Sequence, residues 1–164
     1  MKKSATIFLQ GVIVLIGMVA LIIMIRFPLT EGRAANLDLF SIYTDLFVLY
    51  GFAASIPFFI ALYKAFKFLG YVRRHNVFSP NSVRALRSIR YCAMLLSILL
   101  VLAGLYIRLF HDADEDPAGF LAVSMVTAFV AIVVAVAVAV FENIIQKGMD
   151  IQSENEQLHK ELKK

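Results

Sequence analysis

Four stretches of this chain consist almost wholly of apolar residues, and polar segments separate them. The stretches lie at about 7–25, 46–68, 91–107 and 118–141. As α-helices that rise about 1.5 Å per residue they would extend roughly 25 to 36 Å, which matches a hydrocarbon core of about 30 Å. The pattern predicts an all-α fold, an integral membrane four-helix bundle that occupies residues 1–141.

The remaining segment, residues 142–164, is polar but keeps a seven-residue apolar period. A period of this kind with an asparagine at one a position is typical of parallel two-stranded coiled coils. It predicts a cytoplasmic helical tail, and three interpretations stay open: pairing of two copies, capture of a partner through Asn155 and Leu158, or a frayed helix that lies on a surface. The a and d positions are Ile144, Gly148, Ile151, Asn155, Leu158 and Leu162.

The composition agrees with a membrane protein, and the charges indicate its orientation. Of the 164 residues 60% are hydrophobic and 17% are charged, too few polar side chains to cover a soluble domain of this size. The two ends of the chain and the segment from Lys64 to Arg90 hold 13 of the 16 cations. By the positive-inside rule we expect a multi-pass protein of the bacterial inner membrane, with both termini and this basic loop in the cytoplasm.

Residues 79–90 carry a pattern of their own. Ser79 followed by Pro80 is typical of an N-cap and a first helical position. From Val83 to Ile89 an apolar residue recurs at every third position, beside a strip of arginines. We expect a basic amphipathic segment that lies on the inner leaflet and binds anionic headgroups, without direct contact to nucleic acid. The cations assigned to headgroup or partner binding are Arg73, Arg74, Arg84, Arg87 and Arg90.

Two features inside the stretches concern how the helices bend and pack. Pro57 removes a backbone hydrogen bond in the middle of the second stretch, which predicts a kink that serves either as a hinge or as a passive bend. Small residues three or four positions apart predict seams where helices approach closely, within one bundle or between subunits. The packing positions are Gly51, Ser55, Ala131, Ala135 and Ala139.

The apolar stretches offer little chemistry. Ionisable residues lie at their ends, and Gln10 is the one strongly polar residue well inside. Proton-coupled export usually needs a buried carboxylate, and a disulfide oxidoreductase needs paired cysteines, whereas Cys92 is the only cysteine. The acidic segment 111–116 is either a solvated outer loop or a divalent-cation site. Because no nucleotide-binding or hydrolase motif is present, the sequence predicts no enzyme and no cofactor.

Two segments resemble a known family. Residues 56–91, which begin Ile-Pro-Phe-Phe-Ile-Ala-Leu-Tyr and end Ser-Val-Arg-Ala-Leu-Arg-Ser-Ile-Arg-Tyr, resemble the central signature of the bacterial membrane family catalogued as domain of unknown function 2975. Residues 151–156 are similar to the Glu-Asn-Asp near the end of many members. The resemblance implies four spans and no established activity. It also implies a partner by analogy, since genes of the family often lie beside that of a small helix-turn-helix regulator.

Together these features predict a non-enzymatic inner-membrane protein that works through two cytoplasmic surfaces, residues 78–90 and 149–162. It would act as a sensor, or as an anchor that sequesters a cytoplasmic helix-turn-helix regulator. One alternative is a small transporter or channel subunit with Pro57 as its hinge, and another is a structural assembly factor. The expected partners are the lipid bilayer with its anionic headgroups, the cytoplasmic regulator and a second copy of the chain.

Overall fold

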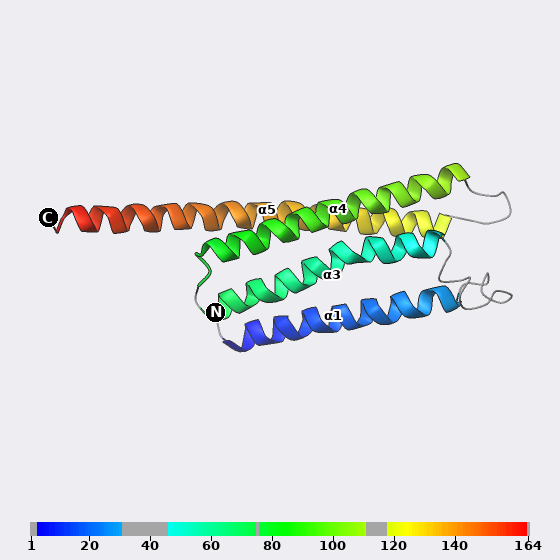
Figure 1. The fold of residues 1–164 in the computed structure, drawn as a ribbon, viewed down its shortest axis with the longest axis horizontal. Coiled ribbons are helices and arrows are strands. Elements are labelled where there is room, and N and C mark those ends of the chain that lie inside the picture. The colour runs from blue at the N-terminus through cyan, green and yellow to red at the C-terminus, as the bar shows by residue number, and fades with distance from the viewer. Residues whose placement is uncertain (1–2, 31–45, 75, 111–117, 164) are drawn as a thin grey trace.

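Four long helices make up the computed structural model, which describes residues 3–30, 46–74, 76–110 and 118–163. The helices are α1 (Lys3–Thr30), α3 (Leu46–Arg73), α4 (Pro80–Phe110) and α5 (Ala118–Glu161), and they run alternately up and down (Figure 1). Each is long and apolar enough to cross a membrane. The predicted all-α membrane bundle of four helices is confirmed.

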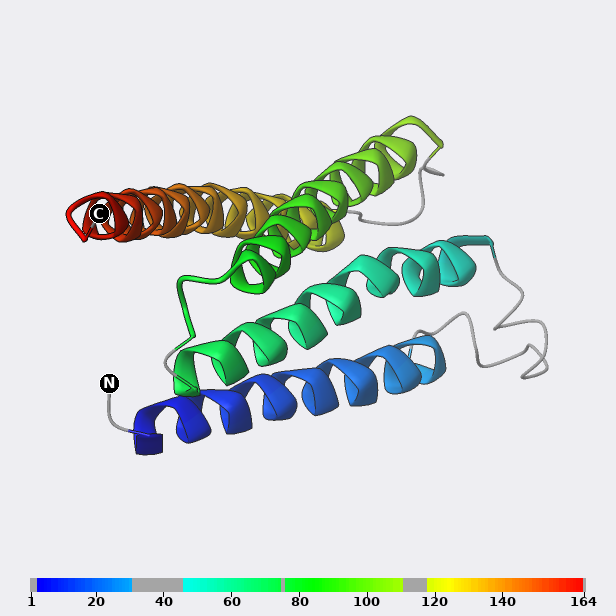
Figure 2. The same cartoon turned by 60° about the vertical axis from the view of Figure 1, so that its left-hand side comes forward.

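Within the described residues, the helices pack mainly against their neighbours in the chain. Helix α4 makes its most extensive contact with α5 and a further one with α3, and α1 packs against α3. Figure 2 shows α1 and α3 side by side, with α4 next to them and α5 beyond α4. Helix α1 therefore lies at one edge of the bundle, and many of its apolar side chains, such as Leu15 and Ile22, are exposed. In a bilayer these side chains contact lipid tails, which solvate them as well as a protein core would.

Small residues mediate the contact between α4 and α5 along the apolar part of the helices. On α5 they recur every three or four positions on one face, so the two backbones can approach closely. Ala139 continues this face and is half-buried. The small residues buried in this part are Ala93, Ser97 and Ala103 on α4, which packs against both α3 and α5, and Ser124, Ala128, Ala131 and Ala135 on α5.

The predicted seam and hinge on α3 have different surroundings. A Cβ atom built on Gly51 would meet nothing within 4 Å, so this glycine packs against no described helix of its own chain. Ser55 is half-buried, and its hydroxyl donates a 2.6 Å hydrogen bond to the carbonyl of Phe52. Pro57 is buried, and α3 continues through it from Leu46 to Arg73. A seam between subunits at Gly51 and a hinge at Pro57 stay predictions.

Helix α4 begins where the sequence predicts. The hydroxyl of Ser79 accepts a hydrogen bond from the backbone N–H of Ser82 at 3.3 Å, and both hydroxyls lie within 3.1 Å of the carbonyl of Asn76. Ser82 is completely buried. These bonds cap the helix and tie it to the short connection that follows α3.

The placement predicted for residues 79–90 needs a correction. Helix α4 includes this segment and runs without a break to Phe110, so it is no separate helix on the leaflet. Its apolar residues Val83, Leu86 and Ile89 are buried against side chains of α3 and α5. The apolar side of an amphipathic helix can pack on protein as well as on lipid, and its periodicity does not distinguish the two.

Helix α5 is much longer than the other helices. Its 44 residues extend about 66 Å, and the last part projects past the bundle (Figure 1). From Asp150 to Lys163 every side chain is exposed. The fourth span and the polar tail therefore form a single helix.

Candidate functional site

Three segments meet at one end of the bundle: the end of α3, the start of α4 and the part of α5 that leaves the bundle (Figure 1). We call it the tail end. Its core consists of large apolar side chains, in contrast to the alanines and serines between α4 and α5 in the spans. The core comprises the buried residues Val83, Leu86, Ile89 and Ile145, with Ala61, Ala65, Phe68, Val77, Val138 and Met149 packed against them.

Next to this core, a buried carboxylate pairs with two arginines. Glu142 on α5 is 2% exposed. Its Oε1 accepts a 2.8 Å hydrogen bond from Nε of Arg87, and its Oε2 lies 3.0 Å from Nη1 of Arg90. Among the described residues Oε2 accepts no well-aligned hydrogen bond, so its contact with Arg90 is mainly one of charge. Because a buried charge without a partner is costly, these ion pairs hold α5 in register with α4.

The cations at this level lie beside tyrosines. The guanidinium carbon of Arg90 is 5.2 Å from the ring centroid of Tyr91, and Nζ of Lys67 is 5.3 Å from that of Tyr63. Both distances allow a cation–π interaction. Tyrosine next to lysine or arginine is typical of the boundary between hydrocarbon and headgroups. The residue types at the level of Arg90 and Glu142 therefore fit an edge of the membrane-spanning part.

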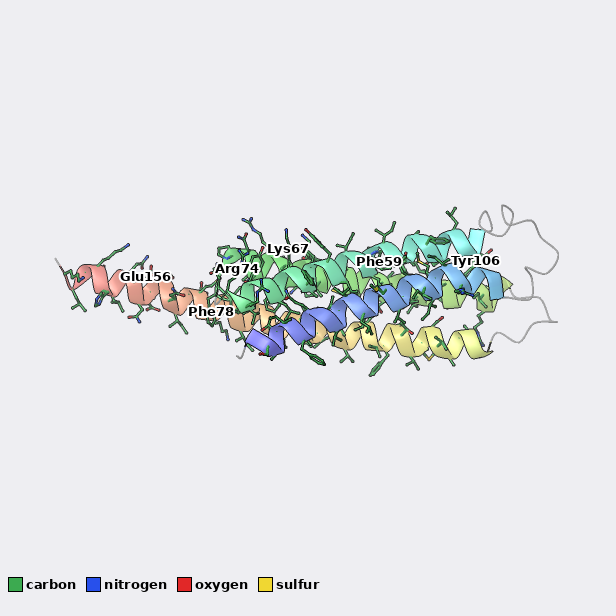
Figure 3. The ribbon with its side chains drawn as sticks, turned by 90° about the horizontal axis from the view of Figure 1, so that it is seen from below. Phe59, Lys67, Arg74, Phe78, Tyr106 and Glu156 are labelled. Atoms are coloured by element: carbon green, nitrogen blue, oxygen red, sulfur yellow. The ribbon has the colours of Figure 1, made fainter. Side chains whose placement is uncertain are left out.

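Phe78 contacts α5 beyond that level. Its ring covers Gly148, and a Cβ atom built on Gly148 would lie 2.7 Å from Cδ1 of the ring, too close for a real contact. Figure 3 shows Phe78 against α5, with Lys67 and Arg74 at the same end and Tyr106 toward the opposite one. The absence of a side chain at position 148 thus allows the loop before α4 to lie directly on α5.

The structure separates the predicted basic residues into two groups. Arg87 and Arg90 share Glu142, although Arg87 is also exposed to solvent, whereas Arg73, Arg74 and Arg84 are exposed and lie outside this pairing. The five arginines together keep a positive charge, because the one carboxylate in contact with them neutralises only a single charge. Binding of headgroups by these residues stays a prediction.

The roles of Glu142 and Gly148 were not predicted from the sequence. For Glu142 one signal was present: it is the first carboxylate after a long apolar run, and Arg87 and Arg90 lie on one face of another helix at a spacing of three. For Gly148 the tail periodicity gives an a position without any sign of a contact with Phe78.

The part of α5 beyond the bundle carries an apolar face that nothing described covers. We call it the outer stripe. It begins on the side of α5 that faces away from the core residues Val138, Glu142 and Ile145. Asn155, predicted to bind a partner, lies within the stripe and is exposed. The apolar members, each more than half exposed, are Phe141, Ile144, Ile151, Leu158 and Leu162.

Polar groups elsewhere have structural contacts or lie outside the described residues. Nε2 of Gln10 donates a 3.4 Å hydrogen bond to the carbonyl of Phe66, which joins α1 to α3. In the described ranges, no three histidine, cysteine or acidic side chains gather as metal ligands would. The acidic segment 111–116 lies outside these ranges.

Comparison with known sequences supports the predicted family. The family described as "Protein of unknown function (DUF2975)" matches residues 12–157. The uncharacterized membrane protein YoaS of Bacillus subtilis (strain 168) is 36% identical over 158 residues, which cover 95% of this chain and 98% of the relative. No solved structure matches the chain.

Proposed function

The chain belongs to the DUF2975 family of membrane proteins of unknown function, and we propose that it is a non-enzymatic anchor that holds a cytoplasmic regulator at the bacterial inner membrane. Helix α5 is the docking element of this proposal, and the tail end of the bundle is its base. The excess of cations at the ends of the chain and in the α3–α4 connection supports a cytoplasmic tail end.

The observation that carries the proposal is the continuity of α5. One helix contains the fourth apolar span and then projects with every side chain exposed from Asp150 to Lys163. Its base is fixed by the ion pairs of Glu142 and by the burial of Ile145 in the tail-end core. Because helix formation propagates easily once it has begun, a fixed base also stabilises the projecting turns. A rigid exposed helix at a fixed place is well suited to holding a partner.

The charges of the first half of the tail support a partner that binds DNA. Residues 148–158 carry three carboxylates, Asp150, Glu154 and Glu156, and neither lysine nor arginine. DNA-binding surfaces are rich in lysine and arginine because they neutralise phosphates. A helix-turn-helix regulator bound here would place its cations against these carboxylates, so binding to the membrane would compete with binding to DNA.

Recruitment of the regulator in cells tests the proposal. A small helix-turn-helix regulator of the kind that the family resemblance implies is fused to a fluorescent protein, and its membrane-bound fraction is measured with the full chain and with a variant lacking residues 149–164. The variant keeps the buried residues Glu142 and Ile145 and loses only Met149 from the side chains packed against the tail-end core. Arg108→Gln, which removes one charge from the last turn of α4 and leaves the tail unchanged, is the matched control.

We expect the truncation to lower the membrane-bound fraction at least about tenfold, which corresponds to a loss of about 1.4 kcal/mol of binding free energy, and the control to have no effect. Equal recruitment by the truncated and full chains would remove the tail from the mechanism. The transporter and assembly-factor alternatives stay untested predictions.

A further inference from the structure

We infer that a second copy of this chain covers the outer stripe of α5, so that two tails form a short parallel coiled coil from Ile151 to Leu162. This pairing goes beyond the proposed function, because it requires no regulator. The outer stripe fits the a and d positions of a heptad, with Ile151 and Leu158 at d and Asn155 and Leu162 at a. All four side chains are exposed on the single chain.

Lipid is a poor occupant for this part of the stripe. Ile151 lies nine residues past Glu142 and Leu162 lies twenty, which places them about 14 and 30 Å along the helix from the membrane edge. Each headgroup layer is only about 5 to 8 Å thick. A helix that leaves the bundle in line with its fourth span therefore carries these apolar side chains into water. Their exposure to water is unfavourable unless protein covers them.

The bilayer fixes the orientation of a second copy. Two chains inserted with the same topology have α5 pointing the same way, so their tails can pair in parallel without a change of direction. Membrane confinement also raises the effective concentration of one tail near another, and two heptads that would associate weakly as free peptides are thereby favoured.

The polar residues of the tail fit this parallel arrangement. In register, Asn155 of each chain faces Asn155 of the other, a pair whose amides can hydrogen-bond and which typically specifies two strands. Between heptads, Glu154 at g lies opposite His159 at e of the second copy, and Lys147 at g lies opposite Gln152 at e. No like charges are opposed in these pairs. An apolar stripe that only contacted lipid, or that packed nonspecifically on other apolar surfaces, would not need an asparagine at this position.

Phe78 defines where the coil begins. Gly148 would be the preceding a position, but the ring of Phe78 from the same chain already covers it. The side chains of the second copy therefore begin to pack against this helix at Ile151, one turn further from the membrane. The polar side of each tail, which includes Asp150 and Glu156, stays exposed for other contacts.

Cysteine crosslinking in native membranes tests the pairing. Cys92, the only cysteine, is first replaced by serine, and single cysteines are then introduced at the d positions as Ile151→Cys and Leu158→Cys. The matched controls are Ser153→Cys and Lys160→Cys at the f positions, on the opposite side of the same helix. Membranes are treated with copper phenanthroline, and the dimer is measured on a non-reducing gel.

We expect the two d-position variants to give at least about five times more dimer than the two f-position controls, because only paired d positions come within disulfide distance. Equal crosslinking at d and f, no dimer at d, or adducts of another mass that indicate a different protein would each overturn the proposal. The experiment is done without the regulator. A dimer without recruitment contradicts only the proposed function, and recruitment without a dimer contradicts only the pairing.

Discussion

The membrane-spanning part of the bundle and its tail end are packed by different kinds of side chain. In the spans, alanine and serine fill the seam between α4 and α5, and large apolar residues point outward. At the tail end the large apolar residues Val83, Leu86, Ile89 and Ile145 point inward, beside the buried carboxylate of Glu142. One continuous helix, α5, takes part in both kinds of packing.

This difference follows from the solvent on each part. Lipid tails are as apolar as leucine, so burial gains little in the spans, and close packing of small residues is what holds the helices together. Outside the hydrocarbon water is the solvent, and burial of leucine, isoleucine and valine becomes favourable. The tail end is therefore built like the core of a soluble protein, although it is continuous with the spans.

The largest effect is expected from truncating a core residue of the tail end. Leu86 is 4% exposed, and Leu86→Ala should lower the free energy of unfolding by about 3 kcal/mol through lost burial and the cavity left behind. Leu102, on the lipid-facing side of the same helix, is 51% exposed, and Leu102→Ala should cost less than about 1 kcal/mol. Unfolding by titration with sodium dodecyl sulfate measures both, and equal losses would remove the distinction between the two regions.

Removing the buried charge should have the next largest effect. Glu142→Gln keeps the shape of the side chain but leaves Arg87 and Arg90 without their counter-charge, and we expect a loss of about 2 kcal/mol. Arg84→Gln removes an exposed charge one helical turn before Arg87 and should change the free energy of unfolding by about 0.5 kcal/mol or less. The same detergent titration compares them. If Glu142→Gln were as stable as the original chain, the ion pairs would not hold α5 in register.

Leu86 also shows how far the sequence predicts the structure. Apolar runs of sufficient length predicted the four spans, and Ser79 followed by Pro80 predicted the start of α4. Both predictions succeed because each depends only on residues close together in the sequence. Leu86 was assigned to the apolar side of its segment correctly, but to lipid instead of protein. Periodicity shows which side of its own helix a residue occupies and does not show what covers that side.

The candidate site could be predicted less well than the fold, because it depends on register between helices. Arg87 and Glu142 are 55 positions apart, and their contact exists only because α4 and α5 align over several turns. The contact between Phe78 and Gly148 depends in the same way on the path of the loop before α4. The exposed tail was more predictable, since its heptad period is local.

A smaller effect is expected in the seam of small residues between α4 and α5. There, replacing a small side chain by a larger one should lower the free energy of unfolding. Ala131 is buried against α4, and Ala131→Leu should destabilise the bundle by about 1 to 2 kcal/mol because the added atoms force the helices apart. Ala137 is exposed on the same helix, and Ala137→Leu should be close to neutral. Detergent titration again gives the comparison, and a neutral Ala131→Leu would mean that close approach of α4 and α5 is not needed.

The smallest net effect is expected at Gly148, where two opposing terms nearly cancel. Gly148→Ala gains about 1 kcal/mol of helix propensity, but its new Cβ atom must displace the ring of Phe78, which is half-exposed and can rotate away. A double-mutant cycle with Phe78→Ala separates the terms: Gly148→Ala should stabilise the Phe78→Ala chain by about 1 kcal/mol and the original chain by much less. An equal gain in both backgrounds, measured by detergent titration, would show that the ring does not rest on α5. In that case the coil proposed for the tail would begin one turn nearer the membrane, at residue 148 itself.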